Sequence, residues 1–180
     1  LAPSWFARAA PVVARELLGK ALVVGSVSAR IVETEAYTSD DPASHSFVGR
    51  TARNSVMLGP PAHLYVYLSY GIHCCANVVT GADGDGQAVL LRAVEPLTGH
   101  DEIRARRPGR SDRDLANGPG KLCAALGVSL ADNGIDLTGA TSALRIVDDG
   151  TPVPVRPVVG PRIGITKAVD VPWRFRMPLR

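Results

Sequence analysis

The segment that most constrains the fold is residues 27–37, VSARIVETEAY, which begins with alternating apolar and polar side chains and continues with three polar residues at 33–35. Alternation of this kind is typical of a strand, where residues two apart point to the same face. Glu33, Glu35 and Tyr37 then share one face. Two carboxylates on one strand face cost free energy unless a cation or water compensates them. The segment is therefore either an edge strand with a wet face or one wall of a charged site.

The rest of the chain gives a mixed α/β pattern. An amphipathic helix interrupted by Pro11 is expected within residues 5–18, and residues 40–61 have the Asp, Ser, Gly, Asn and Pro content of a long loop. The Pro- and Val-rich remainder indicates short strands that close the same sheet. We find no repeat or linker, so we expect residues 1–180 to form one domain. The other expected elements are strands at 20–24, 64–69, 72–80 and 88–94, and helices at 101–107 and 121–126.

Arg92 interrupts the otherwise apolar run AVLLRAVEP. A guanidinium on a buried strand cannot lose its proton, so it needs a carboxylate or equally strong acceptors. A glutamate of the neighbouring segment 27–37 is the obvious partner. A purely structural ion pair explains this pattern as well as a functional one does.

The aromatic side chains are concentrated in one part of the sequence. All four tyrosines lie between positions 37 and 70, and strand alternation places Tyr65 and Tyr67 on the same face. Tyr70 lies beside Gly71 at the expected tip of a hairpin, where a large ring packs poorly into a core. Core packing is the usual role of aromatic rings, but flat rings also bind flat ligands such as nucleobases by stacking.

Basic residues are unevenly distributed in a chain of formal net charge +3. Residues 156–180 contain six basic residues and one acid, and a second basic stretch spans residues 104–113. Such clusters fit either a solvated surface or a polyanionic partner. No apolar run is long enough to cross a bilayer, and three cysteines do not form a disulfide framework. We therefore expect a soluble cytoplasmic protein without membrane association.

Metal and nucleophile chemistry are weakly indicated. The four histidines show no helical i, i+4 spacing and the cysteines form no CxxC pair. A composite metal site from Glu33, Glu35, His45 and His63 stays open as an alternative. No G-x-S-x-G elbow or Cys–His pattern stands out.

Several motifs together resemble a known family, the alkyladenine or 3-methyladenine DNA glycosylases, which excise damaged purines from duplex DNA. The resemblance runs from about residue 13 to residues 173–175. It implies one compact α/β domain of the α+β type, with a mixed, largely antiparallel sheet flanked by helices and a protruding β-hairpin. The motifs are RIVETEAY (30–37), ASHSF (43–47), RTARN (50–54), GPPAHLYVYLSYGIHCCANVV (59–79), AVLLRAVEP (88–96) and NGPGKLCAALGV (117–128).

The resemblance also implies a mechanism. Glu35 matches the base that activates a water, while Arg92 and the backbone carbonyl of Ile163 match the groups that hold this water. The damaged nucleotide swings out of the helix, because its glycosidic bond is inaccessible within the stack. The family needs no cofactor, no metal and no covalent lysine intermediate, and it leaves the abasic site uncut.

The same resemblance assigns the binding residues. The rings of Tyr37, His45 and Tyr67 match those that enclose the extruded base, and Tyr70 matches the side chain inserted into the duplex. Backbone groups of Ala43 and His45 match those that read the adenine-type edge, and Asn77 matches the residue that crowds the guanine amine. The basic residues expected to contact DNA are Arg50, Arg53, Lys121 and Arg162. The expected partner is double-stranded DNA containing damaged purines, bound by a monomer near the nucleoid of a bacterial-type cell.

Small departures from the family pattern affect the expected lesion range. Ala62 and Ala52 stand where relatives usually carry Gly and Pro, and residues 72–76 are smaller and less aromatic than in many relatives. Two other function classes remain open: a non-catalytic nucleic-acid-binding module and a metal-dependent nucleotide hydrolase. Glu35 beside Arg92 argues against the first, because a pure binder gains nothing from an anionic strand that faces phosphates. Activity that survives a chelator would exclude the second.

Overall fold

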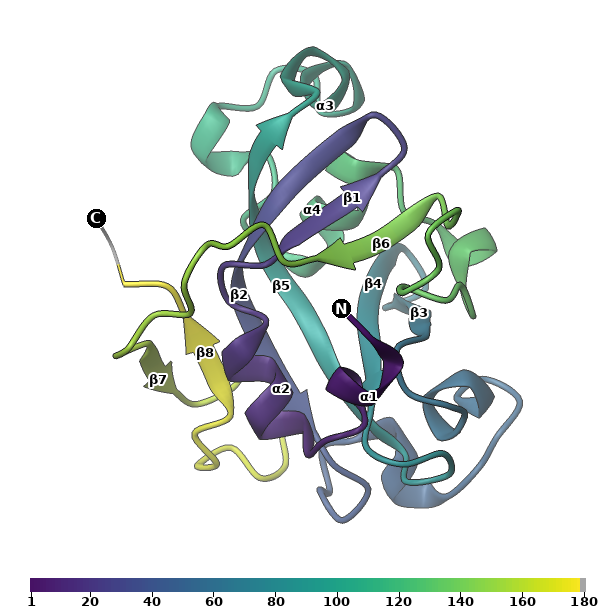
Figure 1. Ribbon diagram of the computed structural model, residues 1–180. Helices are drawn as coiled ribbons and strands as arrows, with labels where there is room; N and C mark the ends of the chain where they lie inside the picture. The colour runs from purple at the N-terminus through teal and green to yellow at the C-terminus, as the bar shows by residue number, and fades with distance from the viewer. Residues whose placement is uncertain (179–180) are drawn as a thin grey trace.

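A computed structural model describes residues 1–178, so Arg180 of the C-terminal basic stretch lies outside the described residues. Short helices surround one sheet of eight strands (Figure 1). No helix among the described residues has the length and hydropathy needed to span a bilayer. The helices are α1 (Pro3–Phe6), α2 (Ala10–Glu16), α3 (His100–Arg106) and α4 (Pro119–Leu126). The strands are β1 (Ala21–Val24), β2 (Val27–Tyr37), β3 (Leu64–Ser69), β4 (His73–Thr80), β5 (Gln87–Thr98), β6 (Leu144–Val147), β7 (Val158–Gly160) and β8 (Arg174–Arg176).

The strand order is β3-β4-β5-β2-β1-β6, and every pairing between described strands is antiparallel. The long strand β2 pairs with β5 along one edge. On its other edge β2 pairs with β1 through residues 27–30 and with β8 through residues 33–35. The α+β fold with a largely antiparallel sheet is confirmed, and the C-terminal remainder does close the same sheet.

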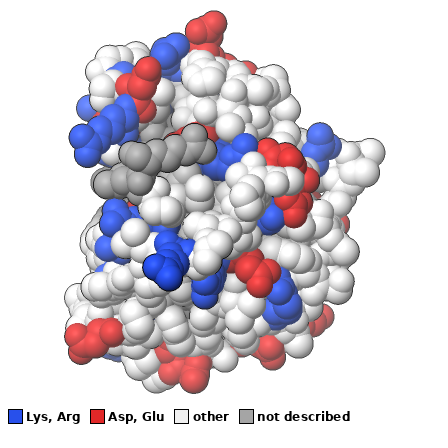
Figure 2. Space-filling model, turned by 60° about the vertical axis from the view of Figure 1, so that its left-hand side comes forward, with Lys and Arg blue, Asp and Glu red and all other residues white. Residues whose placement is uncertain are grey.

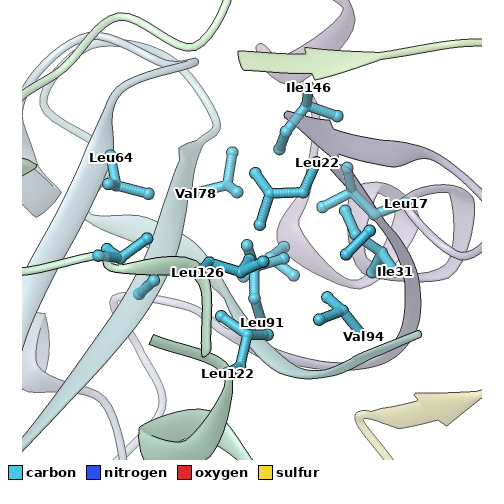
Figure 3. Packing of buried hydrophobic residues seen from close by; sticks show 14 of the residues in the cluster. Leu17, Leu22, Ile31, Leu64, Val78, Leu91, Val94, Leu122, Leu126 and Ile146 are labelled. Carbon is cyan, nitrogen blue, oxygen red and sulfur yellow. The ribbon is translucent and has the colours of Figure 1, made fainter. Parts of the chain in front are cut away.

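Strand alternation divides the side chains between two faces of the sheet. Leu64 and Val66 of β3 belong to the main core together with residues of α2 and α4, while Tyr65 and Tyr67 pack in a second, smaller cluster. In Figure 3 core side chains from β1 to β6 converge on Leu122 and Leu126 of α4. The face opposite this core is the one that carries the candidate site.

The N-terminal helix differs from the expectation. We expected one helix interrupted at Pro11, whereas the chain forms α1 and α2, and the break precedes Pro11. Proline lacks an N–H donor and has a helical φ, so it fits the first turn of a helix, where no intrahelical partner is lost. Pro11 therefore begins α2 instead of interrupting it.

The long loop at 40–61 is ordered by its own polar side chains. It contains two short 3-10 helices, η1 (His45–Val48) and η2 (Ser55–Leu58). The buried Asn54 amide donates to the carbonyls of His45 and Gly49, both at 2.9 Å. These contacts join the segment that precedes η2 to η1 and the residue that follows it, and so hold the loop together.

The hairpin of β3 and β4 ends in a tight turn at the expected position. Tyr70 and Gly71 have φ values of 51° and 71°, and the Ile72 N–H donates to the Ser69 carbonyl at 3.1 Å. Positive φ at both central residues matches the twist of a hairpin. Tyr70 is 89% exposed and Ile72 73% exposed, so the tip presents two large apolar side chains to solvent.

Candidate active site

A cavity of about 640 Å³ opens on the face opposite the main core. Its walls come from β2 to β5, from the loop at 42–45, from the first residue of α4 and from residues 163–167. Segments far apart in the sequence therefore meet around one space, which has a volume typical of small-ligand sites. The predicted residues that line it are Tyr37, Ala43, His45, Arg53, Tyr67, Tyr70, Asn77, Arg92 and Ile163.

Glu35 lies directly behind this lining and its side chain is completely buried. Its Oε1 accepts the Ile163 N–H at 2.8 Å and lies 3.3 Å from an Arg92 Nη1. Its Oε2 accepts the Tyr37 hydroxyl at 2.9 Å. All three partners of the carboxylate line the cavity, so the expected pairing of Glu35 with Arg92 is present beside an aromatic pocket.

Two irregularities in the pairing of β2 with β5 orient the side chains of Glu35 and Arg92. Ile31 pairs with Val94, Glu33 with Ala93 and Thr34 with Leu91, which leaves Val32 and Arg92 as the extra residue of each strand. β-Bulges redirect side chains and often occur next to active sites. Here the bulge at Arg92 accompanies contacts of its guanidinium with both acids of β2.

Glu33 lies between two arginines. Its Oε1 accepts from Arg92 Nε at 3.3 Å and from Arg174 Nη1 at 3.0 Å. Thr34 points to the opposite face, where its buried hydroxyl donates to the Ala14 carbonyl. The two carboxylates of β2 therefore do share one face, and two cations compensate them.

The aromatic wall is built from rings in contact. The ring centroids of His45 and Tyr67 are 4.5 Å apart in an edge-to-face arrangement, and those of Tyr65 and Tyr67 are 5.7 Å apart. His45 Nδ1 and the buried Tyr65 hydroxyl are 3.0 Å apart. From the sequence, Tyr65 was expected only to share a face with Tyr67. No local sequence pattern indicates a hydrogen bond between Tyr65 and His45.

Burial sets the protonation of these rings. It lowers the pKa of His45, with the Arg53 charge adding to the effect, so His45 is neutral at pH 7. Burial and the neighbouring Glu35 raise the pKa of Tyr37, and burial and Cys75 raise that of Tyr67. The pocket therefore offers uncharged, electron-rich rings.

Ala43, expected to read the base edge, and Asn77, expected to crowd the guanine amine, both form hydrogen bonds within the protein. The Ala43 N–H donates to Asp41 Oδ1 at 3.0 Å, which leaves its carbonyl for a ligand. The buried Asn77 amide donates to the Tyr65 carbonyl at 3.1 Å, which directs its oxygen elsewhere. Both residues line the cavity.

Arg162 does not fit the expectation of a DNA contact. Its side chain is completely buried and forms a bidentate ion pair with Asp41. The guanidinium also donates to the Ala36 carbonyl at 3.0 Å and lies 4.6 Å from the centroid of the Tyr37 ring. Arg162 therefore stands behind the aromatic wall and has no surface to offer to a phosphate. The sequence did not reveal Asp41, because the pair joins positions 121 residues apart.

The other expected cations are more accessible. The Arg53 guanidinium lies 5.6 Å from the Tyr67 ring centroid, and the exposed Arg50 donates to the Leu58 carbonyl. Lys121 pairs with Asp114 and donates to Asn117 Oδ1 at 3.0 Å. In the second basic stretch Arg104 and Arg106 pair with acids. Figure 2 shows the result on one face, where basic and acidic side chains are interspersed.

Metal binding finds no support in the part of the chain that the structure describes. Residues 1–178 contain no group of three or more His, Cys, Asp or Glu side chains arranged to hold a metal ion. In particular, Glu33 and Glu35 contact arginines, and His45 contacts Tyr65. The composite metal site that the sequence left open is not assembled.

A buried carboxylate fixed beside an aromatic cavity on a net basic α+β domain is the arrangement expected of a hydrolase that acts on nucleic-acid bases. Comparison with known proteins agrees. The sequence profile of the methylpurine-DNA glycosylase family matches residues 4–179. The chain belongs to the methylpurine-DNA glycosylase family, and it is a DNA glycosylase, that is, an N-glycosyl hydrolase.

Relatives from several bacteria carry the name "Putative 3-methyladenine DNA glycosylase". One from Nitrosospira multiformis is 54% identical over 163 residues, covering 91% of this chain and 82% of its own length. One from Burkholderia lata is 49% identical over 178 residues, covering 97% and 86%. One from Nocardia farcinica is 50% identical over 176 residues, covering 93% and 82%.

Proposed function

We propose that this chain removes alkylated purines, 3-methyladenine among them, from duplex DNA in base-excision repair. The observation that carries the proposal is Glu35, a buried carboxylate held by Arg92, Tyr37 and Ile163 directly behind an aromatic cavity. The proposed unit is residues 1–180 acting as one domain and as a monomer, in the cytoplasm and at the nucleoid. It works without a cofactor.

The damaged base occupies the cavity after it leaves the helix. Tyr37 contacts one face of the base, and the His45–Tyr67 pair contacts the other. Alkylation of a purine ring nitrogen often makes the base cationic, and each favourable cation–π contact with such rings is worth about 0.5–2 kcal/mol. Neutral His45 adds no repulsion. Asn77 and Ala43 line the cavity; in this proposal the Ala43 backbone reads the base edge and Asn77 crowds the guanine amine.

Glu35 then directs water to the sugar. An ionised carboxylate offers about four acceptor positions. The hydrogen bonds from Ile163 and Tyr37 use two of them, and Arg92 Nη1 lies 3.3 Å from Oε1. A remaining position receives a proton of the attacking water. The oxygen of this water bonds to the anomeric carbon, the C1′–N bond breaks, and its electron pair leaves with the base. The water's proton passes to Glu35, and an intact strand with an abasic site remains.

Access to Glu35 is part of this proposal. Because the side chain is completely buried, water reaches it only if one of the lining groups shifts when DNA binds. Ile163 is 50% exposed and precedes Gly164, which has a φ of 77°. The Ile163 side chain and residues 164–167 are therefore the part of the lining that we expect to move, while the Ile163 N–H stays on Glu35.

The hairpin tip and nearby cations hold the duplex. Tyr70, at the exposed tip, enters the space that the extruded base vacates. Arg50 and Arg53 contact phosphates near the cavity. Lys121 also contacts a phosphate, after its ammonium group breaks the ion pair with Asp114.

Release of 3-methyladenine from alkylated duplex DNA by the purified protein tests the function. We expect free base and an uncut abasic strand, with the same yield in the presence of a chelator. Loss of activity with the chelator would favour a metal-dependent hydrolase, and tight binding without base release would favour a non-catalytic binding module.

A further inference from the structure

Two residues outside the cavity lining connect the groups that hold Glu35. We propose that Glu33 and Arg174 are positioning residues for the hydrolytic step, an inference that rests on the function proposed above. They act by fixing Arg92 and the backbone of Ile163 relative to the Glu35 carboxylate.

The Arg174 guanidinium contacts the Glu33 side chain through one nitrogen and the Pro161 carbonyl through another. It lies opposite Glu35 in the β2–β8 ladder. Its Nη1 donates to Glu33 Oε1 at 3.0 Å, and its Nε donates to the Pro161 carbonyl at 2.8 Å. The planar guanidinium presents several donors in a fixed geometry, which a lysine ammonium does not reproduce. Arg174 is therefore suited to hold a side chain and a backbone segment at once.

Each of these two contacts of Arg174 is connected to Glu35 through one further group. On one side Glu33 accepts from Arg92 Nε at 3.3 Å, and Arg92 Nη1 lies 3.3 Å from Glu35. On the other side Pro161 is two residues before Ile163, whose N–H donates to Glu35 at 2.8 Å. The contacts form a closed path from Glu35 through Arg92, Glu33, Arg174 and the 161–163 backbone to Glu35. Both groups that fix Oε1 therefore depend on the Glu33–Arg174 pair.

The charges along this path explain why both partners are needed. Two carboxylates and two guanidiniums alternate, so the group is neutral as a whole. Without Arg174, Glu33 and Glu35 share Arg92 alone, and Glu33 competes with the catalytic carboxylate for that cation. Without Glu33, Arg92 loses its second acceptor and Arg174 loses its anchor.

Neither residue is placed to touch the substrate. The side chains of Glu33 and Arg174 are 18% and 20% exposed, and neither lines the cavity. Their effect is thus indirect. Small displacements of catalytic groups lower rates by up to about 100-fold even when the substrate still binds.

The test compares Arg174→Lys and Glu33→Gln with the wild type in two assays, single-turnover release of 3-methyladenine at saturating enzyme and binding to abasic-site duplex. We expect a rate about 10- to 100-fold lower, with binding changed by less than about twofold and far-UV dichroism unchanged. The double variant should be no slower than the slower single variant, because both changes open the same path.

Arg176→Lys is the matched control, since Arg176 lies on the same strand and forms no ion pair among the described residues. It should excise at the wild-type rate. Wild-type rates in both test variants, or equal losses in Arg176→Lys, would overturn the inference while the wild type still releases base. If Arg174→Lys fails to fold, the single-turnover rate of Glu33→Gln alone tests the inference. If the wild type itself releases no base, the proposed function fails.

Discussion

Asp41→Asn should destabilise the protein strongly, because it leaves Arg162 as an uncompensated buried charge. The side chains of this pair are 0% and 2% exposed. Among the described residues Asp41 is the only acid that pairs with Arg162, and the Arg162 Nε has no acceptor. Removing one member of a buried ion pair costs about 3–5 kcal/mol. For a domain of this size the Tm then falls by roughly 6–20 °C.

Thermal and urea unfolding of Asp41→Asn and the wild type measure this loss. Asp112→Asn is the control, since the Arg104–Asp112 pair is 51% and 73% exposed and such pairs contribute about 1 kcal/mol or less. A loss in Asp41→Asn no larger than in the control would refute the reasoning.

The same pair separates two roles for Arg162. If its role is structural, Arg162→Met destabilises the fold but leaves the salt dependence of DNA binding unchanged below its Tm. Arg50→Met, at an exposed cation, should lower the salt slope by about one. A similar reduction in Arg162→Met would restore the original expectation of a phosphate contact.

Two further predictions concern the hairpin and the aromatic wall. Tyr70→Ala should weaken capture of the flipped lesion more than it slows the chemical step. Measurements of the affinity for lesion-containing duplex and of the single-turnover rate check this. A loss confined to the single-turnover rate would contradict it. Because burial lowers the pKa of His45, its contribution to stability is complete above the unfolded pKa of about 6.5 and is lost as the pH falls below that value. Urea unfolding at pH 7.5 and 5.5 should show a smaller pH effect in His45→Gln, and an equal effect in both proteins would disprove the assignment.

Local patterns predicted much of the fold. The bounds of β2 and β3 follow from alternation, and the turn at Tyr70 follows from its neighbouring glycine. Strand β5 runs four residues further than expected, to Thr98, because Pro96 is accommodated where the register with Ala29 shifts. The alternation of side chains within one segment cannot show that a strand tolerates a proline, because this tolerance depends on the register of the partner strand.

The site was predictable only in part, for a related reason. Arg92 required an acid and Glu35 required a cation, so chemistry alone suggested their pairing. The resemblance supplied the roles of the rings and of the Ile163 backbone. The partners of Arg162 and Arg174 lie more than 120 residues away in sequence. Only the folded sheet, in which β8 joins β2, shows these contacts.

In the proposed mechanism the Glu35 carboxylate activates water for cleavage of the N-glycosidic bond. Glu35→Gln preserves the size of the side chain but removes the base, so single-turnover release of 3-methyladenine measures the claim directly. We predict that this variant releases no detectable base while it still binds abasic-site duplex with wild-type affinity. Base release by Glu35→Gln at the wild-type rate would contradict it.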